Sequence, residues 1–139
     1  MRRKKLDRIV LDTNIWISYT LYNKLYRIAE LIAEFDIEVF TCPEILSEFT
    51  DVLKRPAYKK YLTLPVAEHA KFIEEITTQI KIDKRFDRAA DPDDNFLFDL
   101  AYTAKCYYVV TDEPLLLNMK HVHPIQIISF KELLQILRA

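Results

Sequence analysis

The stretch Ile9-Val10-Leu11-Asp12-Thr13-Asn14 is a short run of branched apolar residues that stops at an acid. Such a run predicts a buried strand, because it is too short for a helix and carries no helical periodicity. The same pattern recurs at Tyr108-Val109-Val110-Thr111-Asp112-Glu113. If both strands belong to one parallel sheet, they end at the same edge, where such sheets place their ligands. Asp12 and one of Asp112 and Glu113 are therefore expected to meet there.

Along the rest of the chain, apolar runs of strand length alternate with segments of helical periodicity. The sequence predicts strands at 8–11, 37–40, 80–82, 107–110 and 125–128, and helices at 25–35, 41–55, 65–79, 95–105 and 129–138. Alternation of this kind is typical of an α/β fold with a central parallel sheet between two layers of helices, a three-layer α/β/α sandwich. With no linker or repeat in the chain, we expect residues 1–139 to form a single domain.

Two capping boxes predict where helices begin. Thr41 with Glu44, and Ser129 with Glu132, each place a hydroxyl residue three positions before a Glu. Asp93 or Asp94 is expected to cap the helix that begins near residue 95.

The composition excludes several classes of protein. The 139 residues contain no Gly, which removes the dinucleotide-binding fingerprint, the P-loop and the nucleophile elbow. The net charge of −1 argues against binding nucleic acid through a general positive field. Two cysteines, Cys42 and Cys106, do not form a metal-binding or disulfide pattern and fit a reducing cytoplasm. No apolar run is long enough to cross a membrane, and the basic leader 1–5 is not followed by a signal sequence.

Two further acids lie on predicted helices. Glu48 lies between Ile45 and Val52 on the helical wheel, so it is expected to border the buried face, whereas Asp99 points away from its helix's apolar side and is expected to be solvated or to support the site. Asp94 faces inward at the start of the next helix. Together with the two strand ends, these acids predict an oxygen-only cluster, and mutual repulsion requires a cation such as Mg²⁺ or Mn²⁺ to hold it. Metal sites of this kind usually serve phosphate chemistry.

Other candidate features favour structural interpretations. Helical spacing of Tyr19, Tyr22 and Tyr26 favours packing in the core or a dimer over base stacking, and Trp16 is interpreted in the same way. The pair His121 and His123 is predicted to lie in a surface loop. Most basic residues with a possible role in substrate binding are interpreted as ordinary surface charge; they are Lys54, Arg55, Lys59, Lys60, Lys84, Arg85 and Arg88.

These stretches, in this order, resemble the PIN-domain nucleases, close to the VapC-like toxins of type II toxin–antitoxin modules. The resemblance is carried by Ile9–Asn14 ("LDTN"), by the helix segments Pro43–Phe49 and Val52–Pro56, by Asp91–Ala101 ("DPDD") and by Tyr108–Glu113. It implies that Asp12, Glu48 and Asp94 are three metal-site acids. The fourth acid is either Glu113, which stands at the family's Asp position, or Asp112. Thr13, Asn14, Asp93 and Thr111 are expected to line or orient the site.

The resemblance also implies an activity and partners. It implies a Mg²⁺- or Mn²⁺-dependent endoribonuclease that cuts single-stranded or structured RNA, is neutralised by an antitoxin protein, and forms a homodimer. The cysteine usage and the apolar runs add the expectation of a cytoplasmic protein without membrane contact. The irregular fourth acid leaves an alternative open: a catalytically weak or inactive PIN-fold module that binds RNA or a protein. A DNA nuclease also remains open. The Asp12-Thr13-Asn14 sequence lacks the D-x-D of haloacid-type phosphatases and the acid pair of receiver domains.

Overall fold

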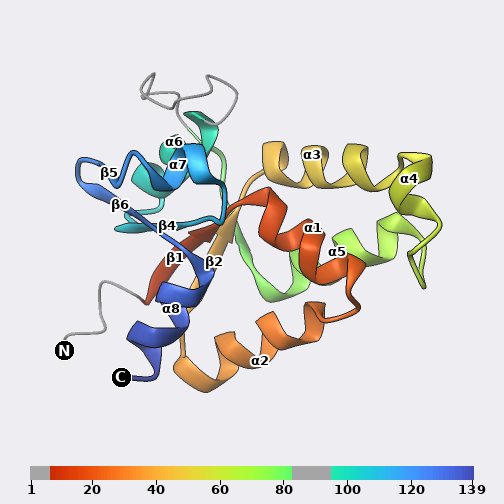
Figure 1. Cartoon of the computed structure of the whole chain (residues 1–139), viewed down its shortest axis with the longest axis horizontal. Helices are drawn as coiled ribbons and strands as arrows, with labels where there is room; N and C mark the ends of the chain where they lie inside the picture. Colours follow the sequence, from red (N-terminus) through yellow and green to blue (C-terminus); the bar gives the residue numbers. More distant parts are fainter. Residues whose placement is uncertain (1–6, 83–94) are drawn as a thin grey trace.

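The fold is built around a mostly parallel β-sheet (Figure 1). A computed structural model describes residues 7–82 and 95–139. Within these residues the sheet has the order β3-β2-β1-β4-β6-β5, and all neighbouring strands are parallel except β5 and β6. The strands are β1 (Arg8–Leu11), β2 (Glu38–Thr41), β3 (Thr78–Gln79), β4 (Tyr108–Val110), β5 (His121–Val122) and β6 (Ile125–Ile128).

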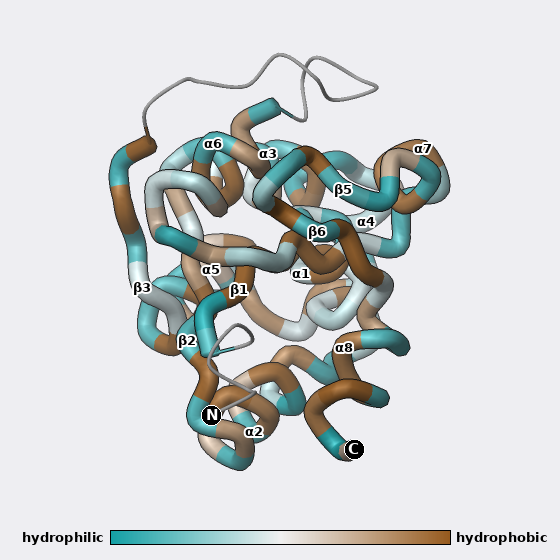
Figure 2. Tube along the Cα trace, turned by 90° about the vertical axis from the view of Figure 1, so that its left-hand side faces the viewer, coloured by the Kyte–Doolittle hydropathy of each residue, from teal (hydrophilic) through white to brown (hydrophobic). Residues whose placement is uncertain are grey.

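Helices cover both faces of this sheet. Figures 1 and 2 both show α6 on one face and α2 with α8 on the other, while α1, α3, α4 and α5 form a group beside the sheet. The helices are α1 (Thr13–Leu21), α2 (Leu25–Phe35), α3 (Pro43–Leu53), α4 (Pro56–Lys59), α5 (Val66–Ile76), α6 (Asn95–Thr103), α7 (Pro114–Leu117) and α8 (Phe130–Leu137). The predicted three-layer α/β/α architecture is confirmed, with one antiparallel strand, β5, at an edge.

Strand β1 lies in the middle of the core. Val10 pairs with Phe40 of β2 on one side and with Val109 of β4 on the other. Val10 is fully buried, because helices cover both sides of the sheet. Asp12, the next residue after β1, therefore lies at the centre of the sheet's carboxyl edge.

Several predicted elements are confirmed with their caps. Helix α2 has the predicted bounds, and β6 occupies 125–128. The capping box of α8 is complete: the Glu132 amide donates to Ser129 Oγ over 3.0 Å, and the Ser129 amide donates to Glu132 Oε1 over 2.9 Å. Two reciprocal bonds satisfy amides that the first helical turn leaves without partners.

The predicted capping box at Thr41 is wrong. Thr41 is the last residue of β2, and α3 begins at Pro43 after Cys42, without a side-chain cap. The Thr41 hydroxyl instead pairs with the Thr77 hydroxyl over 3.1 Å. The sequence pattern missed this because the hydroxyl finds its partner 36 residues away.

The predicted boundary near residue 79 is also wrong. Helix α5 ends at Ile76, and the strand is Thr78–Gln79 rather than 80–82. Thr77 already has extended backbone angles, and its hydroxyl donates to the carbonyl of Ile73 over 2.6 Å. A β-branched residue that bonds back to the preceding turn is a poor helix former, so the helix ends there.

Four elements were not predicted: the helices α1, α4 and α7 and the strand β5. Helix α1 lacks a clear apolar stripe, because its side chains are buried on most sides, including the polar Thr13 and Thr20. Strand β5 places His121 in a two-residue antiparallel pair with β6 rather than in a loop. Within residues 7–82 and 95–139, no helix is both long and apolar enough to cross a membrane.

Candidate active site

Asp12 is the buried carboxylate of the sheet edge. Its backbone amide donates to the carbonyl of Val110 over 2.8 Å, which continues the β1–β4 pairing one residue past the strand. The side chain is only 4% exposed, although a carboxylate is rarely buried without compensation. The central position of β1 thus places the Asp12 carboxylate at the edge of the sheet where β1 and β4 end.

Thr111 connects the two strand ends. Its hydroxyl donates to Asp12 Oδ2 over 2.7 Å and accepts a hydrogen bond from the Glu113 backbone amide over 3.0 Å. Thr111 is fully buried. Thr111, which was predicted to support the site, therefore uses its one hydroxyl oxygen to hold both the Asp12 carboxylate and the backbone of Glu113.

The two adjacent acids after β4 have different surroundings. Glu113 is half-buried, and its Oε2 accepts a hydrogen bond from the Asn14 side-chain amide over 3.3 Å. Asp112 is exposed, and its Oδ1 accepts from the backbone amide of Phe130, the first residue of α8, over 3.2 Å. Glu113 thus faces the Asp12 side, whereas Asp112 is engaged with the start of a helix.

Glu48 lies on α3 and is exposed, so the expectation that it borders the buried face is wrong. The buried face of α3 consists of Ile45, Phe49 and Leu53. Glu48 instead lines a groove of about 540 Å³ between α3 and Phe96 of α6. Its charge nevertheless acts on Asp12, which places it on the same side of the molecule as the sheet edge.

The electrostatics of Asp12 combine opposing influences. Burial raises the pKa of the Asp12 carboxyl above its usual value, and the negative charges of Glu48 and Glu113 raise it further. The Thr111 hydroxyl and the Asn14 backbone amide act in the opposite direction. Hydrogen bonds hold the Asp12 carboxylate in place. Among the described residues, no positively charged side chain contributes to its pKa shift.

The remaining predicted site residues fall into two groups. Asp93 and Asp94 lie outside the described residues. Thr13 is buried, and its hydroxyl has no hydrogen-bond partner among residues 7–82 and 95–139; Asn14 is exposed at the start of α1. In the same ranges no three His, Cys, Asp or Glu side chains are grouped closely enough to hold a metal ion.

The donor set nevertheless fits a hard divalent cation. Asp12, Glu48 and Glu113 offer only carboxylate oxygens, the ligands that Mg²⁺ and Mn²⁺ prefer. A cation would also relieve the repulsion that raises the pKa of Asp12. The two cysteines are unsuited to such a role, because burial raises the pKa of Cys42 and of Cys106 to about 12.

Asp99 was expected either to be solvated or to support the site. The residue is 2% exposed on α6, so the expectation of a solvated side chain is wrong, and support of the site stays a prediction. The α6 helix packs against strands β1, β2, β4 and β6, which leaves few of its positions exposed. A helical wheel alone does not reveal how many sides of a helix are covered.

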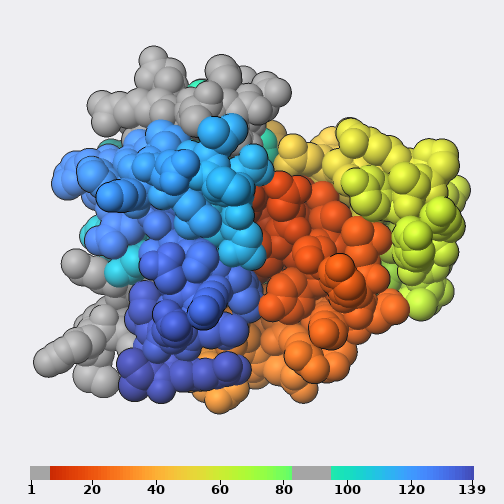
Figure 3. Space-filling view, viewed as in Figure 1, coloured from red at the N-terminus to blue at the C-terminus, as the bar shows by residue number. Residues whose placement is uncertain are grey.

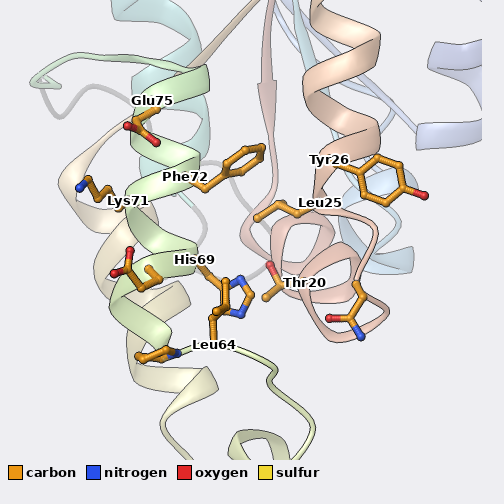
Figure 4. Close-up of a pocket in the computed structure, with 11 residues that line it drawn as sticks. Thr20, Leu25, Tyr26, Leu64, His69, Lys71, Phe72 and Glu75 are labelled. Carbon is orange, nitrogen blue, oxygen red and sulfur yellow. The ribbon is translucent and has the colours of Figure 1, made fainter.

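A second hollow lies away from the carboxylates, between α5 and the α1–α2 segment (Figure 4). Its volume is about 660 Å³, and its lining includes Leu25, Tyr26, Phe72 and His69. His69 is 9% exposed, and its Nε2 has no hydrogen-bond partner in the described part of the chain. Burial lowers the pKa of His69, so the ring is neutral at pH 7.

Comparison with known sequences agrees with this geometry. Residues 8–113 match the profile of the family described as "PIN domain". The uncharacterized protein MJ1680 of Methanocaldococcus jannaschii is 27% identical over 113 residues, which are 78% of this chain and 73% of that protein. The matched range 8–113 begins at β1 and ends at Glu113, so it includes the acids from both strand ends.

Proposed function

This chain belongs to the PIN-domain family, and from that premise we propose that it is a metal-dependent endoribonuclease that hydrolyses phosphodiester bonds of RNA. PIN domains are generally nucleases. The observation that carries the proposal is the buried Asp12, whose pKa is raised by burial and by the charges of Glu48 and Glu113. A buried carboxylate with a raised pKa at the carboxyl edge of a parallel sheet is a candidate for catalysis.

Each side chain has a role in this proposal. Asp12, Glu48 and Glu113 would hold Mg²⁺ or Mn²⁺, with Asp94 as a further ligand. Thr111 fixes the orientation of Asp12, and Asn14 that of Glu113. When bound, the cation supplies positive charge beside the phosphodiester and a lower pKa for the attacking water.

The proton of the attacking water passes to one of the site carboxylates. We assign Asp112 no direct role, because its carboxylate already accepts the Phe130 amide. Asp93 and Thr13 remain supporting residues in the proposal.

The test is cleavage of a labelled single-stranded RNA with Mn²⁺, with Mg²⁺ and with EDTA. Asp12→Asn is the inactive variant, and Asp36→Asn is the matched control, because Asp36 ends α2 in a left-handed conformation that Asn adopts readily. We expect metal-dependent cleavage by the wild type and the control, and none by Asp12→Asn. Equal activity of the wild type and Asp12→Asn would refute the site assignment. A labelled DNA strand in the same assay tests the substrate class.

One observation favours a second candidate function. Glu113 is longer than Asp and is tied to Asn14, which weakens the case for a tight metal site. The chain would then be a catalytically weak PIN module that binds RNA or a protein. Calorimetric titration with Mn²⁺ separates the two: the nuclease binds the ion, and binding is lost in Asp12→Asn, whereas the weak module shows little binding in either protein.

We further propose that the nuclease is the toxin of a toxin–antitoxin pair, acts as a homodimer in the cytoplasm and is neutralised by an antitoxin protein. Support comes from the resemblance of the acidic motifs to VapC-like toxins. Induced production in a bacterial host is expected to arrest growth, and Asp12→Asn to relieve the arrest. Growth arrest by both proteins would contradict a nuclease toxin. Light scattering of the purified protein tests the homodimer.

A further inference from the structure

An exposed stripe on α1 begins at the carboxylates. Asn14, Ser18 and Tyr22 are exposed and follow one another at intervals of four residues, so they lie on one face of the helix. Asn14, at the start of the stripe, donates to Glu113. Eight residues of helix span about 12 Å, a length that accommodates a few nucleotides of extended strand. Figure 3 shows α1 (red) as a continuous exposed surface between the light-blue segment after β4 and the orange α2.

The stripe ends at a small cationic and aromatic pocket. The pocket has a volume of about 280 Å³ and is lined by Ser18, Tyr19, Tyr22, Lys24 and Arg27. Among the described residues, its lining thus contains two cations and no acid. Glu30 acts electrostatically on Arg27 and Asp112 on Tyr19, but neither acid lines the pocket.

The turn between α1 and α2 builds this pocket. Asn23 adopts a left-handed conformation, with φ of 57°, in a chain that has no Gly to do so. The Lys24 amide donates to the carbonyl of Tyr19 over 2.8 Å, and the Arg27 amide donates to that of Lys24 over 2.9 Å. The first bond ties the start of α2 to the last turn of α1, and the second closes the first turn of α2.

The two tyrosines of the pocket have different environments. Tyr19 is held by the Phe130 ring, with 5.2 Å between ring centroids. Tyr22 is 72% exposed, so of the two packing expectations the core is wrong, and packing in a dimer stays a prediction. An exposed aromatic ring beside two cations provides a stacking face for a base and charge for the adjacent phosphates.

We propose that Tyr22, Lys24 and Arg27 form a subsite for single-stranded RNA, reached along the α1 stripe from the carboxylates. Tyr22 stacks a base, and Lys24 with Arg27 contacts the backbone phosphates. The inference rests on the proposed nuclease function and extends it, because it assigns the strand a path across the protein. A duplex presents stacked bases to which Tyr22 has no access, so the subsite selects single strands.

The test measures binding without cleavage. Fluorescence anisotropy in EDTA compares a labelled single-stranded oligoribonucleotide with a duplex of the same sequence. Tyr22→Ala is expected to weaken single-strand binding about fivefold or more and duplex binding little. Arg27→Glu is expected to weaken binding about tenfold and to lower the dependence of log K on log salt by roughly 0.7 for the lost phosphate contact.

Two matched variants control for general effects. Tyr107→Ala removes another exposed tyrosine, at the opposite end of the strands, and Lys71→Glu reverses an exposed cation on α5. Both are expected to bind as the wild type does. Circular dichroism and light scattering at the assay concentration verify that each variant keeps its fold and oligomeric state.

The outcomes distinguish this inference from the proposed activity. Loss of binding in Tyr22→Ala and Arg27→Glu supports the subsite, even where the wild type cleaves no RNA with any metal. Wild-type binding by both variants overturns the subsite, even where metal-dependent cleavage is established. A change of oligomeric state confined to Tyr22→Ala would also overturn it and assign the stripe to contact between copies of the chain.

Discussion

The Thr111 hydroxyl lies 2.7 Å from Asp12 Oδ2, and donates its proton to that carboxylate across the β1–β4 pair. The same oxygen accepts the Glu113 amide. Because this buried hydroxyl donates one hydrogen bond and accepts another, it connects the ends of β1 and β4. Its removal is therefore expected to affect both Asp12 and Glu113.

Thr111→Val is therefore expected to destabilise the protein by about 1–3 kcal/mol, because it leaves the Glu113 amide and the buried Asp12 oxygen each with one partner fewer. Thr111→Ser keeps the hydroxyl and is expected to recover most of this loss and most of the RNA cleavage. Urea unfolding in EDTA gives the stability, and the cleavage assay gives the activity. Similar unfolding midpoints for the Val and Ser variants would show that the hydroxyl is not important.

Asp12→Asn is expected to stabilise the metal-free protein. The pKa of Asp12 is raised in the folded state, so the folded protein binds the proton more tightly than the unfolded chain. Stability then falls as pH rises through the interval between the unfolded value of 3.8 and the higher folded value, and the loss persists at neutral pH. Asn has no charge to bury and keeps an oxygen that accepts the Thr111 hydroxyl.

Thermal denaturation at pH 7 tests this expectation. In EDTA the Asp12→Asn variant should melt above the wild type. Mn²⁺ should raise the melting temperature of the wild type but leave that of the variant unchanged, because a ligand stabilises only the state that binds it. A melting temperature of Asp12→Asn below that of the wild type in EDTA would contradict the electrostatic argument.

Glu113 and Asp112 are expected to respond in opposite ways. Glu113→Gln should lower RNA cleavage on the order of 100-fold with little loss of stability, because it removes one negative charge from the set of site carboxylates. Asp112→Ala should keep most activity and lower stability by about 1 kcal/mol, because the Phe130 amide at the start of α8 loses its acceptor. Cleavage rates and urea unfolding midpoints, measured for both variants, show which acid serves activity and which serves stability. The reverse pattern would make Asp112 the fourth acid.

His69 is expected to make the protein less stable in mild acid. Burial lowers its pKa in the folded protein below the usual 6.5, so the unfolded chain takes up a proton first as pH falls. The stability that the neutral, buried His69 ring contributes is fully present above pH 6.5. It is lost as pH falls from 6.5 through the lower pKa that His69 has in the folded protein.

Melting temperatures between pH 8 and pH 5 give the measurement for His69. Since other groups also titrate in this range, the relevant quantity is the difference between variants. His69→Phe should show a smaller fall in melting temperature than the wild type, and His121→Gln, which replaces an exposed histidine of β5, sets the baseline. Equal falls in the wild type and His69→Phe would rule out a contribution from this ring.

Local sequence patterns were sufficient for much of the architecture. The apolar runs at β1, β4 and β6 and the amphipathic stripe of α2 predict their elements because burial on one or two faces leaves a periodic trace in the chain. The Ser129–Glu132 box predicts the start of α8 because both bonds join residues three apart. The same logic places Asp12 and the acids after β4 at one sheet edge. Asp93 and Asp94 lie outside the described residues and remain predictions.

Side-chain environments depended on contacts between distant segments. The sequence alone did not decide whether Asp112 or Glu113 is the fourth acid of the site. The two adjacent residues differ in their hydrogen-bond partners: Asp112 accepts from the Phe130 amide, and Glu113 accepts from the Asn14 side chain. Helical wheels did not predict that Glu48 is exposed and Asp99 buried, because a wheel assigns faces but not which faces other elements cover. The sequence alone was enough to predict the strands β1, β4 and β6, the helices α2 and α8 and the strand-end acids, since those signals are local. Tertiary packing decided which acids are buried, paired or exposed, since burial and hydrogen-bond partners come from residues far away in the chain.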